Sequence, residues 1–542
     1  MLSPRRSRAF VLVPVLLFLI TWYYCGFASI LLQLDRNKFK LPHSSVNEGH
    51  AVVEPPVSLK SSESLYSQPT PSISSAEDLY SRPTLSTSIV EPSQTAGTIS
   101  HYQDLVTSPS DVLLIFKTGA STFWRRIPVH LITTLSNGRV PNSVIYSDLP
   151  EKLASNIESV DALANVSDLI KSYDPAAHDS YLELQSPSHV NTYREHARLP
   201  GDEPKDAKEG NTPGWLLDKY KFLPMLTHAQ RNWPGLRWYI YIEDDTFIFW
   251  NNILQWLSTL SPDNEPSYYG AYSGDGNETF AQGGSGLVFS RSLMRTVFGG
   301  DKLPGLLRYG NYTSNSCCGD IVLGKVLRDH GIYVNGGNYG PVSFRPEPPW
   351  KTGFDELIWC APVFTFHHLH QRDLIELAEV ERTQRASSMP SVSSYTSPKP
   401  SYTDQFHQRP VIFRDIFTAL ILPHLGNNTR SNWDNFASRY TLSANSTTGF
   451  HSDFRPANRT AFDMAFKSSV RCQTACISFD ACLSWRHDSA ASVCALDTVI
   501  KLGRELDPLP TWAPKTEVVS GWMLERMDSR LLSQTCDVVK QP

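Results

Sequence analysis

The sequence predicts an α/β fold for the middle of the chain. Three short apolar runs have the composition of buried parallel strands, and they occupy residues 112–116, 143–146 and 238–242. Helical patterns lie between these runs, around residues 150–171 and 215–231. Because strands and helices alternate along the chain, the pattern is typical of an α/β domain. Ligands of open α/β sheets bind beyond the carboxyl ends of the strands, so the residues after each run are the first candidates for a site.

Composition narrows the classes of protein to which the chain can belong. It has 542 residues, of which 49 are Lys or Arg and 54 are Asp or Glu, for a net charge of −5. This weak acidity argues against a nucleic-acid binder, which normally has a basic face. Proline, at 38 residues, outnumbers glycine, at 30, and indicates extended linkers between compact parts.

The N-terminus is typical of a membrane signal-anchor. A short basic tail at residues 1–8 precedes an uncharged apolar run at residues 9–32. At about 1.5 Å per helical residue, this run is long enough to cross a hydrocarbon core of about 30 Å. The alternative is a signal peptide that is cleaved before secretion, because Gly26 and Ala28 are small residues that suit a cleavage site. The run exceeds the usual apolar region of a signal peptide, which favours the anchor.

Sequons of the form Asn-x-Ser/Thr favour a lumenal or extracellular body. The N-glycosylation candidates are Asn165, Asn277, Asn311, Asn427, Asn445 and Asn458. Because the basic residues on the two sides of the span barely orient it, these sequons and the cysteine pattern decide its direction. We therefore expect a single-pass type II membrane protein with a short cytosolic tail.

Two segments have the composition of linkers. Residues 33–108 are rich in Ser, Thr and Pro and cannot bury enough apolar surface to fold, so we expect a stem that carries O-linked glycans. A second Ser/Pro-rich linker covers residues 383–407. Residues 408–460 are apolar enough to be ordered, and we expect them to pack back on the α/β domain and to include a glycosylated loop.

Three acidic residues follow the third apolar run, at Glu243, Asp244 and Asp245. Neighbouring carboxylates at a strand end are costly to bury unless a cation neutralises them. Mg²⁺ and Mn²⁺ prefer oxygen ligands from one or two carboxylates and from substrate phosphates. The simpler alternative is an acidic turn in water, and an isolated cluster of this kind would favour it.

Further motifs along the sequence shift the balance towards a site. A glycine-rich loop lets the backbone approach a ligand closely, and it consists of Gly283, Gly284, Ser285 and Gly286. Asp320 lies near the start of a predicted helix, either as a cap or as a functional acid. His367 and His368 follow another apolar run, in a position that suits metal ligands.

Taken in this order, the motifs resemble those of the Fringe-like family 31 glycosyltransferases, which include Fringe and the core 1 β1,3-galactosyltransferase. The acidic cluster is similar to their DxD motif, and residues 283–286 to their glycine-rich loop. Residues 320–324 are similar to their acidic helix start, and Phe366-His367 to their late metal histidine. The sequence departs from the pattern at Glu243, where the best-known members have Asp.

The resemblance implies a fold and an activity for residues 109–382, about half of the chain. The fold would be a GT-A-like, Rossmann-like mixed sheet flanked by helices. The activity would be that of a metal-dependent inverting glycosyltransferase in the Golgi membrane, which moves a hexose or an N-acetylhexosamine from a UDP-sugar. The acceptor would be a hydroxyl of a glycan or glycoprotein, and the family often forms β1,3 linkages.

The resemblance also implies roles for individual residues. Asp245 and His367 would hold Mn²⁺ or another divalent cation, which bridges the donor phosphates. Asp320 would act as the general base that takes a proton from the acceptor hydroxyl.

Nucleotide contacts are less closely defined by these motifs. Glu243 or Asp244 would lie near the ribose or the waters of the metal, and Asp148 would reach the nucleotide from the end of the second run. Lys219 and Lys221 lie in a basic helix, where they would either meet the diphosphate or be solvated.

Cysteines cluster near the C-terminus, at residues 461–527, which precede an expected tail at residues 528–542. The four cysteines are Cys472, Cys476, Cys482 and Cys494, and they allow three disulfide connectivities. With Trp485 and Ser520-Gly521-Trp522, they resemble a PAN/apple module of α+β type, as some fungal members of the family carry. This resemblance implies the pairs Cys472–Cys494 and Cys476–Cys482. Such a module would bind protein or carbohydrate, or would simply stabilise the chain.

Five other cysteines complete the set. Cys25 lies in the expected span. Cys317 and Cys318 are candidate partners of Cys360, and the sequence does not choose between them. Cys536 is unassigned, with a free thiol and an intermolecular disulfide as the two alternatives.

Two functions from different classes remain at this point. The first is the glycosyltransferase, which Asp245, Asp320 and His367 favour. The second is a membrane-tethered, catalytically inactive protein that binds carbohydrate or protein through the PAN-like module, which Glu243 mildly favours.

Overall fold

The structure is a computed structural model that describes ten stretches of the chain: 107–186, 213–274, 278–300, 305–335, 340–388, 409–426, 428–444, 447–448, 459–506 and 517–536. The expected membrane span and nearly all of the expected stem lie outside these residues. The sequons at Asn277, Asn427, Asn445 and Asn458 lie outside them as well. Among the described residues, no helix combines the length and the apolar character that a membrane span needs.

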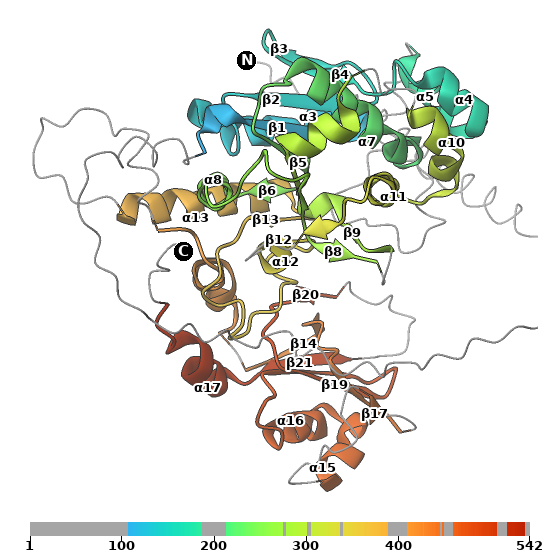
Figure 1. Cartoon of the computed structure of the whole chain (residues 1–542). Coiled ribbons are helices and arrows are strands. Elements are labelled where there is room, and N and C mark those ends of the chain that lie inside the picture. Colours follow the sequence, from blue (N-terminus) through green and yellow to red (C-terminus); the bar gives the residue numbers. More distant parts are fainter. Residues whose placement is uncertain are drawn as a thin grey trace, which may run out of the picture. The chain divides into compact units, whose positions relative to one another are not determined.

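A mixed sheet of eight strands forms the centre of the α/β part, in the order β11-β7-β10-β5-β1-β2-β4-β3 (Figure 1). Its strands are β1 (Val112–Lys117), β2 (Ser143–Ser147), β3 (Lys152–Ala154), β4 (Ile157–Asp161), β5 (Trp238–Glu243), β7 (Tyr268–Tyr269), β10 (Leu287–Ser290) and β11 (Val334–Asn335). β1 runs parallel to β2 and β5, whereas β10 is antiparallel to β5. The three apolar runs of the sequence are thus confirmed as β1, β2 and β5.

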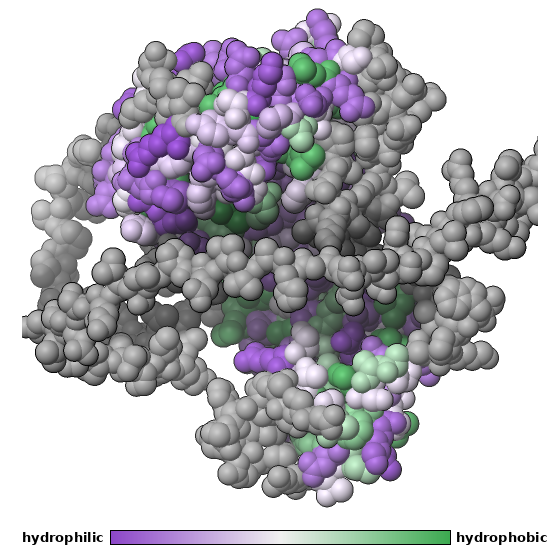
Figure 2. Space-filling view, turned by 90° about the vertical axis from the view of Figure 1, so that its right-hand side faces the viewer, coloured by the Kyte–Doolittle hydropathy of each residue, from purple (hydrophilic) through white to green (hydrophobic). Residues whose placement is uncertain are grey.

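Helices cover both faces of this sheet. The helices of the α/β part are α3 (Ala120–Ile132), α4 (Ser167–Tyr173), α5 (Pro175–Gln185), α7 (Pro213–Asn232), α8 (Trp250–Leu257), α9 (Arg291–Leu293), α10 (Gly305–Asn315), α11 (Gly319–Asp329), α12 (Gly340–Ser343) and α13 (Gln371–Ser388). Leu113 and Ile115 of β1 pack with α7 and α11, while Leu114 and Phe116 pack with α3 and α8. Since successive strand residues point to opposite faces, β1 must be apolar throughout. Outside this core, the described surface over the sheet is mostly hydrophilic (Figure 2).

A small three-stranded sheet brings two distant parts of the sequence together. It has the order β12-β13-β6, with β6 (Phe247–Ile248), β12 (Phe344–Arg345) and β13 (Thr365–Phe366). Thr365 pairs with Ile248, and Phe366 pairs with Phe247 in an antiparallel register. The turn before β6 and the residue after β13 therefore lie at the same end of this sheet. β8 (Tyr272–Ser273) pairs antiparallel with β9 (Phe280–Ala281), which directly precedes the glycine-rich loop.

The C-terminal part is built on a six-stranded sheet in the order β14-β21-β18-β19-β16-β17. Its elements are β14 (Thr429–Ser431), β16 (Tyr440–Leu442), β17 (Thr447–Thr448), α15 (Arg459–Asp463), α16 (Ser469–Ile477), β18 (Ser484–Asp488), β19 (Val493–Asp497), β21 (Val518–Trp522) and α17 (Leu524–Met527). β15 (Trp433–Asp434) and β20 (Arg504–Glu505) form a separate pair. The disulfides Cys472–Cys494 and Cys476–Cys482 are present, which is the pairing that the resemblance implies.

Residues 409–425 pack back on the α/β part, as the sequence predicts. α14 (Phe413–Ile416) contributes Phe413 and Ile416 to a core that also contains Phe354 and Trp359. The same core includes Ile500 of the C-terminal part, whose backbone exchanges two hydrogen bonds of 2.9 Å with Phe354. The described parts on either side of the second linker therefore share one hydrophobic core.

Several boundaries differ from the expectation. Residues 150–171 are not one helix, because β3 and β4 precede the short α4. The C-terminal sheet begins at β14 rather than at residue 461, since β14 and β16 pair with strands of the cysteine-rich part. α13 continues to Ser388, beyond the expected start of the linker at 383. Residues 528–536 of the expected tail are described, and Leu531 among them is buried.

The disulfide of Cys360 corrects two expectations. Cys360 pairs with Cys536, across 176 residues of sequence, and not with Cys317 or Cys318. Cys536 is therefore neither free nor intermolecular. Cys317 and Cys318 are unpaired at the start of α11. The sequence could not indicate this pairing because the last strand and helix must first return to the apolar core beside Cys360.

Candidate metal centre at the ends of the central strands

The acidic cluster lies where β1 and β5 end side by side. Lys117, the last residue of β1, is in register with Glu243, the last residue of β5. The amide of Asp244 then donates to the Lys117 carbonyl at 3.1 Å, and a turn leads through Asp245 into β6. Because β6 pairs with β13, this turn comes next to His367.

Asp245 and His367 form the centre of the site. Both side chains are buried, and His367 Nε2 lies 3.2 Å from Asp245 Oδ1. Asp245 Oδ1 has no hydrogen-bond partner among the described residues. Asp245, His367 and His368 each offer a ligand atom, and the three atoms lie within 4.8 Å of one another. These residues can therefore hold a metal ion, as the sequence predicts for Asp245 and His367.

Electrostatics favour the charged forms of both side chains. Burial raises the pKa of the Asp245 carboxyl, but the positive charges of His367 and Arg126 outweigh burial and hold it well below its usual range. Burial lowers the pKa of His367, and the Asp245 carboxylate more than offsets this, so that it is raised above the ordinary value. Each residue thus favours the charged form of the other, and a divalent cation would compete with the proton for His367.

The glycine-rich loop packs directly against the His367 ring. A Cβ atom at Gly284 would lie only 1.9 Å from His367 Cε1, so no other residue fits here without moving the ring. Gly286 has a φ of +87°, a conformation that side chains other than glycine avoid. Thr246 Oγ1 donates to the Gly284 carbonyl at 2.7 Å and ties the loop to the acidic turn. The glycines therefore position a candidate metal ligand, a role that the sequence did not reveal.

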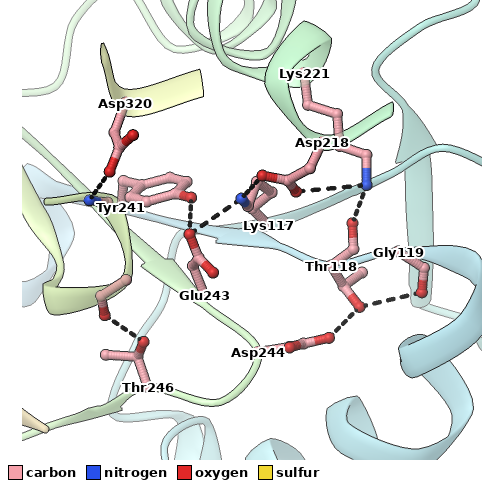
Figure 3. A network of polar contacts seen from close by, with 12 residues as sticks. Lys117, Thr118, Gly119, Asp218, Lys221, Tyr241, Glu243, Asp244, Thr246 and Asp320 are labelled. Atoms are coloured by element: carbon pink, nitrogen blue, oxygen red, sulfur yellow. Dashed lines mark hydrogen bonds and ion pairs between the residues drawn. The ribbon is translucent and has the colours of Figure 1, made fainter. Parts of the chain in front are cut away.

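Glu243 is held by residues of β1 and β5. Its Oε1 accepts from Tyr241 Oη at 2.9 Å and lies 3.0 Å from Lys117 Nζ (Figure 3). Its Oε2 lies 3.8 Å from His367 Nε2. Burial raises the pKa of Glu243, but Lys117 and His367 outweigh it and lower the pKa below its usual value. One oxygen of Glu243 is thus fixed, and the other faces the candidate metal centre.

Asp244 has a different environment from its neighbours. Its side chain points to α3 and the residues just before it. Asp244 accepts from Thr118 Oγ1, which precedes the helix, at 2.5 Å and from Thr122 Oγ1 at 2.6 Å, and it pairs with Arg126 Nη1 at 2.6 Å. His130 Nε2 lies 2.9 Å from its backbone carbonyl oxygen. These contacts use both carboxylate oxygens, so Asp244 anchors the acidic turn to α3 and does not face the centre.

Asp320 lies on the far side of the glycine-rich loop. It is not the cap of α11, because Cys318 occupies that position. Its Oδ2 accepts from the Gly283 amide at 2.8 Å, and Oδ1 accepts from the Ile321 amide at 2.9 Å. Burial and the nearby Glu243 charge raise the pKa of Asp320 above its usual value. A Cβ atom at Gly283 would be 3.4 Å from both Asp320 Cβ and Glu243 Oε1. The backbone of the glycine-rich loop is therefore in close contact with both acidic residues.

Three residues that the sequence assigned to the nucleotide lie in other environments. Asp148 is fully buried and pairs with Lys221, which is 1% exposed, at 2.8 Å. Lys221 also donates to the Thr118 carbonyl at 2.9 Å. Lys219 donates to the Ser314 carbonyl of α10 at 2.7 Å and lies 3.6 Å from Asp174. Neither Asp148 nor Lys219 is brought to the Asp245–His367 pair.

Sequence reasoning missed three charged residues of the site: Lys117, Asp218 and Arg126. Lys117 bridges Asp218 at 2.5 Å and Glu243 at 3.0 Å, and Figure 3 shows it between the two carboxylates. Burial lowers the pKa of Lys117, but the charges of Asp218 and Glu243 more than compensate and raise it. The only sequence signal was a lysine at the end of an otherwise apolar strand.

The ion-pair network that includes the site holds more carboxylates than permanent cations. Ion pairs link the carboxylates of Asp148, Asp218, Glu243, Asp244 and Asp245 to the permanent cations Lys117, Arg126 and Lys221. Five carboxylates against three cations leave two negative charges when His367 is neutral. One divalent cation would neutralise this excess.

Two sequons fall on described residues. Asn165, in a turn before α4, and Asn311, on α10, are both exposed, as an N-glycosylation site requires.

Compared with protein-family models and with curated proteins, the chain gives no match.

Proposed function

We propose that the protein is a metal-dependent inverting glycosyltransferase of the Fringe-like type, with a GT-A-like domain followed by a PAN-like module. The observation that best supports this is the meeting of Asp245 Oδ1 and His367 Nε2 at 3.2 Å, at the carboxyl ends of two parallel strands. Asp320 lies across the glycine-rich loop from this pair. Ligands of α/β sheets bind at this edge.

The donor set fits a borderline divalent cation such as Mn²⁺. A carboxylate oxygen and an imidazole nitrogen are ligands that Mn²⁺ accepts. Asp245 Oδ1 accepts no hydrogen bond from the described residues, and the ion-pair network around it holds more carboxylates than permanent cations, which favours a cation here. Asp245 and His367 would hold it, with Glu243 Oε2 and His368 next to them. When bound, the cation would supply positive charge that stabilises the departing UDP.

Asp320 is the residue that we assign as the general base. Two backbone amides fix its carboxylate, and its raised pKa strengthens it as a base. It would take the proton of the acceptor hydroxyl while the hydroxyl oxygen bonds to the anomeric carbon of the sugar. The bond from that carbon to the phosphate oxygen breaks on the opposite face, which inverts the anomeric configuration.

The remaining parts of the proposal concern location and the second module. With a signal-anchor and a stem, the enzyme would act in the Golgi lumen on a glycan or glycoprotein. The shared core and the Cys360–Cys536 disulfide support the idea that the PAN-like module works together with the catalytic domain.

The direct test is a screen for UDP release with the full-length protein and a panel of UDP-sugars, with Mn²⁺ and with EDTA. We expect turnover of one UDP-hexose or UDP-N-acetylhexosamine with Mn²⁺, its loss in EDTA, and its recovery when Mn²⁺ is restored. Full turnover in EDTA would remove the metal assignment. No turnover and no nucleotide binding would favour the inactive binding protein instead.

A further inference from the structure

Arg126 has a position that its ion pairs alone do not explain. Its Nη1 lies 2.6 Å from Asp244 Oδ1 and 3.1 Å from Asp245 Oδ2. Nε and Nη2 have no hydrogen-bond partner among the described residues, and the side chain is 21% exposed. Burial lowers the pKa of Arg126, but Asp244 and Asp245 more than offset this, so the group stays charged. A charged guanidinium with open donors therefore lies at the edge of the candidate metal centre.

Asp245 connects this guanidinium to the metal centre. Its Oδ1 faces His367, whereas its Oδ2 faces Arg126. The cation position and the Arg126 guanidinium thus lie on opposite sides of the Asp245 carboxylate. An anion that binds both must carry negative oxygens a few ångströms apart, as a diphosphate does.

Helix α3 fixes Arg126 in this position. Four residues spaced four positions apart lie on one face of α3 and of the segment just before it: Thr118, Thr122, Arg126 and His130. All four contact Asp244. Because both Thr residues already satisfy Asp244 Oδ2, one nitrogen of Arg126 suffices to complete the anchor, and the rest of the fork is left for a ligand.

We infer that Arg126 binds the diphosphate of a nucleotide donor, next to the metal held by Asp245 and His367. The planar guanidinium presents paired donors that match phosphate oxygens. Lys219, which the sequence suggested for this task, is engaged with α10 instead. This inference rests on the proposed function, since it requires a nucleotide donor at this centre.

The test compares UDP with uridine, which lacks phosphates, by calorimetric titration of the full-length protein in Mn²⁺. Arg126→Gln should weaken UDP binding by about 10- to 100-fold, because a charge-assisted contact is lost. Uridine binding should be unchanged. Binding of Mn²⁺ without nucleotide should be unchanged or tighter, because a nearby positive charge is removed. Arg372→Gln on α13, where the side chain is 87% exposed, removes the same charge elsewhere and should bind UDP normally.

Two further measurements apply if Arg126→Gln does not fold. Arg126→Lys keeps the charge beside Asp244 but lacks the fork, so it should fold and still bind UDP less tightly. In the unmodified protein, UDP with Mn²⁺ should protect Arg126 from phenylglyoxal, as followed by peptide mass spectrometry. UDP binding that equals the wild type in a folded variant, equal losses for UDP and uridine, or an absence of protection would each overturn the inference. Failure of the wild type to bind any nucleoside diphosphate would instead refute the proposed function.

Discussion

Replacing Gly284 by alanine tests how the site is built. The added Cβ would lie 1.9 Å from His367 Cε1, 2.2 Å from Nε2 and 2.3 Å from Nδ1. The loop cannot easily move away, because the Gly284 carbonyl accepts the 2.7 Å hydrogen bond from Thr246 Oγ1. Gly286 also holds a φ of +87° two residues later. The imidazole ring must therefore move.

The size of the displacement follows from the distances. To bring Cε1 from 1.9 Å to an ordinary contact of 3.4 Å, the ring must shift by about 1.5 Å. Overpacking of this kind costs about 1–3 kcal/mol of stability. A catalytic group that is misplaced by about 1 Å can cost about 100-fold in rate, and the loss of a well-placed ligand should weaken Mn²⁺ binding by at least about 10-fold.

The assays are chemical unfolding for stability and calorimetry for Mn²⁺ affinity. Gly235→Ala is the matched control, because a Cβ there meets no atom within 4 Å. The double variant Gly284→Ala/His367→Ala removes the ring, so in this background the Gly284 change should cost almost no stability. An equal cost with and without the His367 ring, or wild-type Mn²⁺ affinity in Gly284→Ala, would refute the role of the loop.

Four further predictions follow from the geometry. Asp320→Asn should abolish transfer while UDP binding by calorimetry persists, and equal loss of both would contradict the general-base role. Because the pKa of Asp320 is raised, wild-type activity should fall with decreasing pH at a point above the ordinary aspartate value of about 3.9, which a pH–rate profile measures. The same shift affects stability, because the buried Asp320 carboxylate destabilises the fold at a pH above its raised pKa but is protonated below about 3.9. Asp320→Asn should therefore be more stable than the wild type at neutral pH. Urea unfolding should show that this advantage disappears in acid. Replacing Cys360 and Cys536 by serine should lower the free energy of unfolding by up to about 5 kcal/mol for a closed loop of this length, and an unchanged urea midpoint would show that the shared core alone joins the two parts.

The sequence predicted well those features that local patterns determine. The apolar runs became β1, β2 and β5 because a strand buried on both faces must be apolar throughout. The helical pattern at 215–231 became α7, and residues 320–324 opened α11. The helix expected at 150–171 failed because the pairing of β4 with β2 overrode a local preference.

For the candidate site, the order of the motifs indicated which residues to consider but not where their side chains point. Asp245 and His367 lie 122 positions apart in the sequence, and the pairing of β6 with β13 brings them together. Glu243, Asp244 and Asp245 are consecutive, yet the turn directs them to Lys117, to α3 and to His367 respectively. No sequence pattern distinguishes three neighbouring carboxylates in this way.

The sequence by itself determined the α/β class and the order of the motifs, because these depend on residue type and on patterns within a few positions. The meeting of Asp245 with His367 was implied by the resemblance to a family, and the pairing of β6 with β13 brings it about. Only the tertiary structure decided the partner of Cys360, the roles of Gly284, Lys117 and Arg126, and the burial of Asp148. These depend on which distant segments meet. That is set by the packing of helices on both faces of the sheet and by the core that the C-terminal part completes.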